Sequence, residues 1–405
     1  MKASAQAPVT ELQAMAGGRD PTVCVVGPGA RFLSGISYYT YRLVNALAGR
    51  HRVSVILMRR LLPARLYPGR TRVGAPLARL QYDASSVLDG LDWYWFPTMF
   101  RAVGLLLRER PSVVLFQWWS ASVLHSYLAL AVVARLLRAR VVVEFHEVLD
   151  TGEARLPLLR AYVRMIAPLL LRLACGAVVH SDYDRAAVRR QYRTRRPILV
   201  VPHGPYDQYR VDTRLRVLSD SVCNVLFFGV IRPFKGLEDL LGAFNAIPEQ
   251  EIGRYRLTIV GETWEHWTLP AEMIKQSPHR DRITFVNRYV HDDEVGSFFR
   301  DADVVVLPYH RSSSSGPLQI AMSCGLPVVV TSVGGLPEAV GGYAGAILVP
   351  PKDPVALGKA LTIAAGLKGR RFADPHSWET VVDRYDHLFD AISARRHAAP
   401  WVAES

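Results

Sequence analysis

The stretch VVVLPYHRSSSSGPLQIAMSCGLPVVVTSVGGLPEAV, residues Val304–Val340, decides how the rest of the chain is interpreted. It opens with the apolar run Val304–Leu307 and returns to a second apolar run, Leu326–Val330, whose valine content is typical of a parallel strand buried on both faces. Between the two runs, a polar serine loop leads into a helix that starts near Pro317. The stretch therefore predicts two strands of a parallel sheet, with a ligand-facing loop at the carboxyl end of the first.

The serine loop has the composition of an anion-binding site. Ser312 to Ser315 supply side chains that suit a helix N-cap, Gly316 allows close approach by a ligand, and Pro317 suits the first helical turn. The free amides at such a helix start, together with the helix dipole, attract a diphosphate. We therefore expect the segment from Ser314 to Pro317 to contact a bound phosphate group, whereas a flexible surface loop is the alternative that a run of serines also allows.

Length and charge indicate two unlike domains. At 405 residues the chain exceeds what one hydrophobic core usually supports, and half of its residues are apolar, enough for two cores. Residues 1–200 hold 28 Lys and Arg against 12 Asp and Glu, a net charge of +16, whereas residues 201–405 hold 21 against 24, a net charge of −3. A basic half suits nucleic acid, anionic lipid or an anionic substrate. Nucleic acid is the least favoured of the three, because no helix-turn-helix, RNA-binding or zinc-finger motif is present.

An arginine-rich stretch in the basic half indicates a surface that faces lipid. The segment 59–72 carries five arginines interleaved with leucine and tyrosine, and the aromatic residues of 93–100 follow closely. This mixture is typical of a surface that meets anionic lipid, so we expect an anionic membrane surface as a partner. An amphipathic helix packed against its own core is the alternative. No apolar run in the sequence reaches the roughly 18 residues that span a bilayer.

The ends of the chain and its cysteines predict a cytoplasmic protein. Residues 1–20 have no apolar signal-peptide core, so we expect a disordered leader there. The four cysteines are scattered without CxxC or Cys/His spacing, as reduced thiols in the cytosol usually are. If the arginine-rich stretch meets lipid, the protein would be peripheral at the inner face of the cell membrane.

Strands and helices alternate in a first block, residues 21–205. Apolar strands such as Thr22–Val26 and Val53–Leu57 are separated by helical segments, and residues 58–108 are interpreted as a basic and aromatic insert. Such alternation predicts a parallel sheet with right-handed crossovers.

A second block, residues 206–376, repeats this alternation from the strand Val225–Phe228 onward. The sequence thus predicts two α/β domains that face a deep cleft, which is where ligands bind in such sheets. A last helix, within residues 377–405, has no strand after it, and we expect it to pack back across the cleft onto the first domain.

A glycine-rich loop follows the first strand. Gly27 and Gly29 come before Gly35, where the next helix begins, but Phe32 occupies the third glycine position of G-x-G-x-x-G. The dinucleotide fingerprint is therefore not met. The glycines still allow a ligand to approach the backbone, and Gly35 is the expected contact.

Two cations follow the first strand of the second block. The segment GVIRPFKG begins at Gly229 and places Arg232 and Lys235 three residues apart at a strand end. Arginine as a bidentate fork and lysine as a point charge can hold one diphosphate. They would also stabilise charge on a departing nucleotide, an effect worth about 3–4 kcal/mol per well-placed donor. A solvated turn is the alternative.

Polar residues end the strand Val141–Phe145. Glu144, His146 and Glu147 lie where a parallel sheet faces its ligand crevice. His146 could hydrogen-bond a substrate hydroxyl or act as an acid or base near neutral pH, and a structural histidine is an equally weighted alternative.

A third polar group is Glu338, which follows the pair Gly334-Gly335. The glycines allow close approach of backbone, and the Glu338 carboxylate could accept a hydrogen bond from a sugar or ribose hydroxyl. An exposed loop glutamate is the alternative.

Two Asp-x-Asp segments do not predict a metal. Asp182 fits a helix N-cap and Asp303 opens a buried strand, so neither segment resembles a set of metal ligands. We expect no metal and no resident cofactor.

Three segments, Phe228–Lys235, Val304–Val340 and the strand end at His146, together resemble the retaining glycosyltransferases of family 4. These enzymes have the GT-B fold, two Rossmann-like domains facing a central cleft. The resemblance covers about Thr22 to Phe389 and is most specific at SCGLPVVVTSVGGLPE. It implies metal-independent transfer of a sugar from a nucleotide-diphosphate sugar to an acceptor, with retention of the anomeric configuration.

The resemblance also implies roles for the domains and residues. The C-terminal domain would bind the donor and the N-terminal domain the acceptor, a polysaccharide glycan or a polyprenyl-linked glycan. Arg232 and Lys235, beside Gly229, would hold the diphosphate, and His146 would face the transferred sugar. Gly35 and the amides near Ser315 and Gly316 would face the phosphates and the sugar.

The chain departs from the family pattern in the serine loop. Family members commonly carry two glutamates eight residues apart there, for the sugar and for the ribose, whereas this chain has Ser312 and Ile320. Isoleucine accepts no hydrogen bond, so the ribose must be held elsewhere, with Glu338 as a substitute. The departure resembles a subgroup of bacterial surface-polysaccharide enzymes. Two other interpretations stay open: a catalytically silent partner subunit that binds nucleotide, and a nucleotide-sugar epimerase of similar shape.

Overall fold

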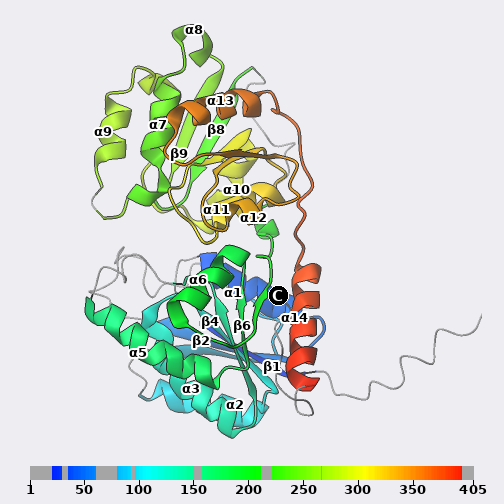
Figure 1. The fold of residues 1–405 in the computed structure, drawn as a ribbon. Helices are drawn as coiled ribbons and strands as arrows, with labels where there is room; N and C mark the ends of the chain where they lie inside the picture. Colours follow the sequence, from blue (N-terminus) through cyan, green and yellow to red (C-terminus); the bar gives the residue numbers. More distant parts are fainter. Residues whose placement is uncertain are drawn as a thin grey trace, which may run out of the picture.

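The fold was determined as a computed structural model that describes residues 21–29, 35–60, 80–92, 96–148, 157–210, 221–265 and 267–394. Two α/β domains lie one above the other, and the chain passes between them twice (Figure 1). The GT-B architecture expected from the sequence is confirmed.

The N-terminal domain is built on a seven-stranded parallel sheet with the order β3-β2-β1-β4-β5-β6-β7. Its strands are β1 (Val23–Pro28), β2 (Val53–Arg60), β3 (Ser86–Asp92), β4 (Val113–Trp118), β5 (Arg140–Phe145), β6 (Gly176–Val179) and β7 (Ile198–Val200). Its helices are α1 (Gly35–Ala48), α2 (Thr98–Glu109), α3 (Leu124–Leu136), α5 (Pro157–Leu173) and α6 (Asp182–Tyr192), with 3-10 turns at Ala121–Val123 and Asp207–Tyr209.

The C-terminal domain is built on a six-stranded parallel sheet with the order β10-β9-β8-β11-β12-β13. Its strands are β8 (Cys223–Phe228), β9 (Tyr255–Val260), β10 (Ile283–Val286), β11 (Val304–Leu307), β12 (Val328–Thr331) and β13 (Ala346–Val349). Its helices are α7 (Leu237–Asn245), α8 (Glu249–Ile252), α9 (Leu269–Lys275), α10 (Asp292–Asp301), α11 (Gly316–Ser323), α12 (Leu336–Ala339) and α13 (Pro354–Ala365), with 3-10 turns at Pro233–Lys235 and Arg280–Arg282.

Both sheets reverse their strand order beside the first strand of the domain, β1 or β8, which is where ligands bind in doubly wound sheets. Alternate residues of β1 enter different cores: Val23 and Val25 pack toward α1, whereas Cys24 and Val26 pack toward α2, α3 and α5. Helices therefore cover both faces of the N-terminal sheet, which is why its strands read as continuous apolar runs.

The insert expected at residues 58–108 is wrong in its described part, because that part contains β3 and α2. β3 pairs in parallel with β2 and so extends the sheet to its edge. The remainder of the proposed arginine-rich stretch, residues 61–72, and residues 93–95 lie outside the described residues, as does the leader at 1–20. Within the described ranges, no helix is long and apolar enough to cross a bilayer.

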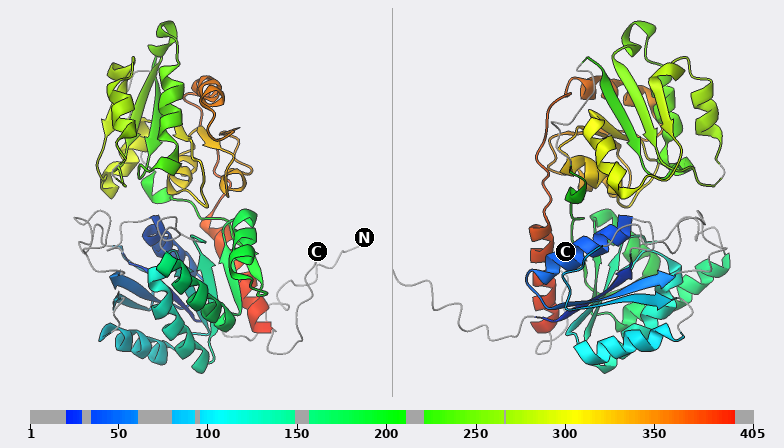
Figure 2. Two further views of the ribbon diagram at one scale, coloured as in Figure 1. Left: turned by 60° about the vertical axis from the view of Figure 1, so that its left-hand side comes forward. Right: turned by 180° about the vertical axis from the view of Figure 1, so that it is seen from behind.

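The last helix, α14 (Trp378–Ala394), lies beside the N-terminal domain, although the chain reaches it from the C-terminal one (Figures 1 and 2). Arg50, after α1, donates to Asp383 at 2.6 Å and to Asp386 at 2.9 Å. The Trp378 indole donates to the carbonyl oxygen of Pro205 at 3.0 Å. These contacts fasten α14 against α1 and the linker, close to the cleft.

Candidate active site

A cavity of about 460 Å³ lies between the two domains and is lined by residues of both. This volume is within the range of small-molecule sites, 300–1,000 Å³. Eight of the ten residues predicted from the sequence line it: Gly35, His146, Gly229, Arg232, Lys235, Ser314, Gly316 and Pro317. Ser315 and Glu338 do not.

The loop after β8 carries the two predicted cations. Arg232 donates from Nε to Glu265 Oε1 at 2.8 Å, and its guanidinium carbon lies 4.9 Å from the centre of the Phe234 ring. The Lys235 ammonium lies 3.7 Å from the centre of the Tyr309 ring. Both cations are therefore held by fixed partners at the cavity. A diphosphate that binds here must compete with Glu265 for the guanidinium.

Glycine is required in this loop at Gly236. It has a φ of +63°, and a Cβ there would lie 1.9 Å from the carbonyl oxygen of Pro308. The loop can therefore rest on the end of β11, which brings the Lys235 loop and the serine loop to the same edge of the sheet.

The serine loop ends in the helix start that the sequence predicts. Ser315 is the N-cap of α11, and its side chain accepts a hydrogen bond from the amide of Leu318 at 3.3 Å. Because of this role Ser315 is buried, and it is not among the residues that line the cavity. Ser314 and Gly316 on either side of it do line the cavity.

Tyr206 lies between the two helix starts that were expected to face a donor. Its hydroxyl donates to the carbonyl oxygen of Gly35 at 2.6 Å. A Cβ at Gly35 would lie 3.3 Å from this tyrosine, and a Cβ at Gly316 would lie 3.2 Å from it. The two glycines thus leave room for one aromatic ring, which joins α1 to α11 across the cleft.

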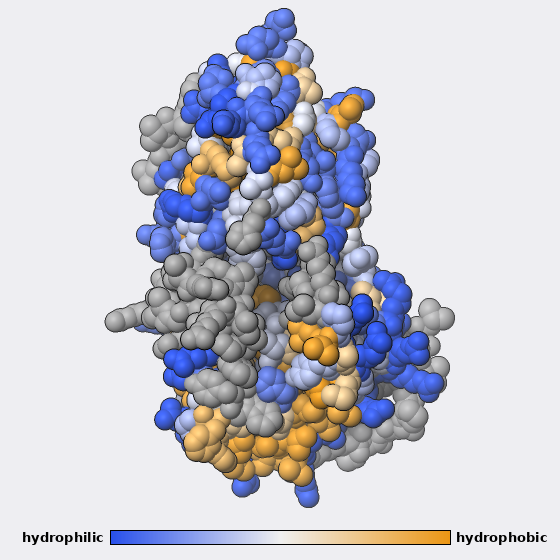
Figure 3. Space-filling model, turned by 90° about the vertical axis from the view of Figure 1, so that its left-hand side faces the viewer, coloured by the Kyte–Doolittle hydropathy of each residue, from blue (hydrophilic) through white to orange (hydrophobic). Residues whose placement is uncertain are grey.

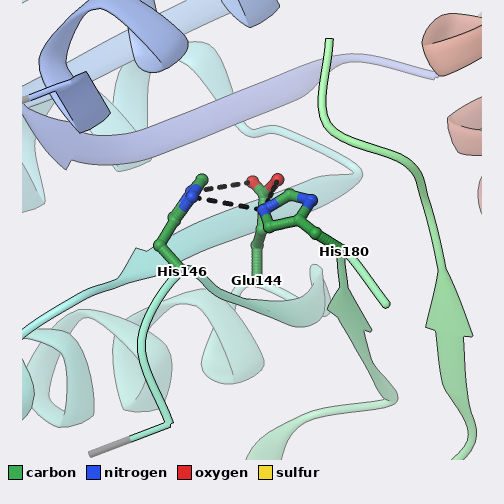
Figure 4. A group of neighbouring side chains, drawn as sticks. All are labelled: Glu144, His146 and His180. Carbon is green, nitrogen blue, oxygen red and sulfur yellow. Dashed lines mark hydrogen bonds and ion pairs between the residues drawn. The ribbon is translucent and has the colours of Figure 1, made fainter. Parts of the chain in front are cut away.

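Polar side chains at the ends of neighbouring strands form a cluster in the N-terminal domain, shown in Figure 4, and His146 is the member of this cluster that lines the cavity. Glu144 is part of β5, His146 follows β5, and His180 follows β6. All three are buried side chains, and one ligand atom from each lies within 4.8 Å of the others. These atoms could hold a divalent metal, and two of the cluster's atoms, Glu144 Oε1 and His146 Nε2, make no hydrogen bond to the described residues.

The hydrogen bonds define one arrangement of protons for a neutral pair of imidazoles. His180 Nδ1 lies 3.0 Å from the carbonyl oxygen of Val201 and must donate to it, so a neutral His180 accepts at Nε2. His146 Nδ1 lies 3.2 Å from this Nε2 and is therefore the donor. In this arrangement His146 Nε2 carries a lone pair and makes no hydrogen bond to the described residues, and it lies 3.9 Å from Glu144 Oε2.

The pKa of His146 is held well below its usual range, first by burial and then by its neighbours His180 and His203. The imidazole is therefore neutral near pH 7 and can accept a hydrogen bond from a hydroxyl. An acid role near neutral pH, one of the two functions expected from the sequence, does not fit this environment.

Two phenols enclose Glu144 from the side of α1 and α14. Burial and the Glu144 carboxylate raise the pKa of Tyr39 and of Tyr385 well above their ordinary values. Glu144 also accepts a hydrogen bond from Gln117 Nε2 at 3.2 Å. The C-terminal helix therefore contributes Tyr385 to the support of the His146 wall.

Glu338 was expected near a ribose or sugar, and the structure places it elsewhere. Its carboxylate accepts hydrogen bonds from the amides of Asp182 at 2.5 Å and Tyr183 at 2.9 Å. Glu338 therefore caps the N-terminus of α6 in the other domain. The preceding Gly334 serves packing as well, because a Cβ there would lie 1.6 Å from the carbonyl oxygen of Ser312.

The aspartates discounted as metal ligands have structural partners. Ser181, and not Asp182, is the N-cap of α6, which corrects the predicted cap by one residue. Asp303 is buried, and it accepts a hydrogen bond from the amide of Asn224 at 2.8 Å.

Ile320, which takes the place of the family's ribose-binding glutamate, lines the cavity. A different carboxylate, that of Asp292, lines the same cavity. Asp292 at the start of α10 accepts a hydrogen bond from the hydroxyl of Tyr209 at 3.2 Å. Burial, and then Asp293, raise the pKa of Asp292 to about 6.

Sequence reasoning missed His180, His203, Tyr39 and Tyr385. A signal for two of them was available, because His180 follows β6 and His203 lies shortly after β7, as His146 follows β5. Three histidines at the ends of three adjacent parallel strands must meet at one sheet edge. The tyrosines carry no comparable signal, since they lie within ordinary amphipathic helices.

Family models match both halves of the chain. A model described as a glycosyl transferase 4-like domain matches residues 34–204, and one described as glycosyl transferases group 1 matches residues 223–365. The two matches cover the two walls of the cavity. The chain therefore belongs to the glycosyltransferases of the GT-B fold.

Curated relatives match over part of their length. The chain is 30% identical over 240 residues to a D-inositol 3-phosphate glycosyltransferase of Geodermatophilus obscurus, which is 54% of this chain and 53% of that protein. It is 32% identical over 117 residues to O-antigen chain mannosyltransferase B of Escherichia coli, which is 29% and 30%. The chain thus spans about half the length, or less, of these relatives.

Solved structures share the whole fold. HepE of Anabaena in complex with UDP has a TM-score of 0.65 at 15% identity, covering 92% of this chain and 100% of that one, and HepE is also known with UDP-glucose. Sucrose-phosphate synthase from Thermosynechococcus elongatus has a TM-score of 0.59 at 20% identity, covering 93% and 97%.

Proposed function

We propose that this protein transfers a sugar from a nucleotide-diphosphate sugar to a glycan or polyprenyl-linked acceptor, with retention and without a metal, at the inner face of the cell membrane. The observation that supports this most directly is the pairing of two cations with one neutral histidine across a single cavity. The structural neighbour HepE binds UDP and UDP-glucose, which supports a donor of this class.

Each wall would act on a different part of the donor. Arg232 and Lys235 would neutralise the diphosphate as the bond to the sugar breaks, because charge develops there in the transition state. His146 would accept a hydrogen bond from a hydroxyl of the transferred sugar through Nε2 and so orient the ring. The N-terminal domain would bind the acceptor. Retention and metal independence follow only from the resemblance to family 4.

The experiment is a panel of UDP-, GDP-, ADP- and dTDP-sugars, read by the melting temperature and by release of free nucleotide diphosphate. A donor at about 100 times its Kd stabilises the folded state by roughly 2.7 kcal/mol, a shift of several degrees. A shift with slow hydrolysis for one donor supports the transferase. A shift with no turnover, even with acceptor extracts, favours the silent partner subunit, and no shift with any donor contradicts the proposal.

A further inference from the structure

One face of the N-terminal domain exposes an unusual number of large apolar side chains. Helix α3 packs between α2 and α5 in a layer on one side of the sheet. Of the fourteen exposed large hydrophobic residues in the described part of the chain, seven lie on these three helices. Leu136 is 78% exposed, Leu158 is 88% exposed and Met165 is 64% exposed. Scattered apolar residues are normal on a surface, but such a concentration marks an interaction site.

Figure 3 views the molecule from the left-hand side of Figure 1, the side on which α5 lies. Apolar residues gather over the lower part of the molecule, which is the N-terminal domain, whereas the upper domain is mostly hydrophilic in this view. We call the outer surface of these helices the α2–α3–α5 face.

The charge of this face has one sign. The three helices carry six arginines, all exposed, and a single acidic residue, Glu109. The Glu109 carboxylate forms an ion pair with Arg52 at 3.1 Å and accepts a hydrogen bond from the hydroxyl of Ser86 at 2.5 Å. Arg101, Arg160 and Arg164 form no ion pair with the residues that the structure describes. The face therefore presents apolar side chains and free guanidinium groups together.

We propose that the α2–α3–α5 face binds an anionic lipid bilayer. Leucine, methionine and phenylalanine side chains suit the boundary between headgroups and acyl chains, and arginine suits the lipid phosphates. Each arginine near an anionic surface contributes about fivefold in affinity. A second copy of this chain does not suit the face, because a two-fold contact would bring the same uncompensated arginines against each other.

This surface differs from the one expected from the sequence. Arg59, at the start of the predicted arginine-rich stretch, pairs with the buried Asp92 and is part of the fold. Phe100 is the member of the aromatic segment that lies on the α2–α3–α5 face, where it is 70% exposed.

The test is flotation of the full chain with vesicles of phosphatidylcholine alone or mixed in equal parts with phosphatidylglycerol. The wild type is expected to float with the anionic vesicles and to bind the neutral ones far more weakly. The variant Arg101→Gln/Arg160→Gln/Arg164→Gln should bind roughly a hundredfold more weakly, from about fivefold per arginine. The variant Leu136→Gln/Leu158→Gln/Met165→Gln should also fail to float.

The matched control is Val355→Gln/Ile363→Gln, which removes two exposed apolar side chains from α13 of the other domain and should float as the wild type does. All substituted side chains are exposed, and unchanged melting temperatures would show that the variants fold. Wild-type behaviour of both face variants, or indifference of the wild type to phosphatidylglycerol, would overturn the proposal. A dimer of the wild type in the absence of lipid, if it is lost in the Leu136→Gln/Leu158→Gln/Met165→Gln variant, would overturn the proposal as well. Flotation measures membrane binding and needs no turnover. A failed flotation therefore contradicts this proposal, whereas a failed transfer assay contradicts the proposed sugar transfer.

Discussion

The two walls of the cavity are built from the same part of the same fold, yet they differ in charge. On the N-terminal wall, His146 and His203 are buried, and burial lowers the pKa of both, that of His203 to about 3. On the C-terminal wall, Arg232 and Lys235 stand at the cavity with aromatic rings beside them. The two histidines of one wall are therefore neutral near pH 7, whereas the other wall carries two cations.

This difference arises from the packing of the segments that leave the strand ends. His146, at the end of β5, is packed under α1, so it loses water and stays neutral near pH 7. The cations after β8 lie in a glycine-containing turn and are only half-buried, so water still reaches their charged groups. A shared sheet geometry can therefore present a hydrogen-bond acceptor for a hydroxyl on one side and a site for an anion on the other.

The largest expected effect comes from removing charge on the cationic wall. Lys235→Ala should lower kcat/KM for a nucleotide-sugar donor by about 10²–10³, because a well-placed donor to the developing charge is worth about 3–4 kcal/mol. Steady-state kinetics would measure the loss, with Lys275→Ala on the exposed side of α9 as the matched control. Unchanged turnover would mean that the diphosphate binds elsewhere.

The second effect concerns the uncharged wall and depends on pH. Because the pKa of His203 is lowered in the folded state, the unfolded chain binds the proton more tightly, and stability is lost as pH falls below about 6.5. Between pH 7 and pH 5 this histidine should cost about 2 kcal/mol. His203→Asn can keep the hydrogen bond that Nδ1 makes to the Gly204 carbonyl at 2.8 Å while removing the titration.

Denaturant unfolding at the two pH values measures this directly, because the contributions of the other titrating groups cancel when the loss of the variant is subtracted from the loss of the wild type. The wild type should lose more stability than His203→Asn between pH 7 and pH 5. His387→Asn, on the exposed side of α14, is the control that removes a histidine outside the cluster. Equal losses in His203→Asn and the wild type would show that the histidine wall is not buried in a neutral form.

How far the sequence predicts this site depends on the range of each interaction. Arg232, Lys235 and the serine loop were found because their roles are local: a strand, a turn and a helix start, all within a few residues. Glu338 was misplaced because its partners, the amides of α6, lie 155 and 156 residues away in the chain. Tyr385 was missed for the same reason, since only the return of α14 brings it to Glu144. The insert at 58–108 was misjudged because β3 is recognised only through its pairing with β2.

The smallest expected effect tests the contact between the two domains that Glu338 makes with α6. Glu338→Ala removes the acceptor for two amides at the N-terminus of α6, which should lower stability by about 0.5–1 kcal/mol. Since Glu338 does not line the cavity, the Kd for a nucleotide-sugar should stay as in the wild type. Thermal unfolding and donor titration on the same sample measure both quantities, with the exposed Glu272→Ala as the control.

The two outcomes separate the structural role of Glu338 from the ribose role that the sequence suggested. If Glu338 bound the ribose, its removal would lower the affinity for the donor, because the hydrogen bonds from the ribose hydroxyls to the charged carboxylate would be lost. A cap would show as a loss of stability without a loss of affinity. A combined loss would mean that the α6 contact and donor binding are linked through this carboxylate.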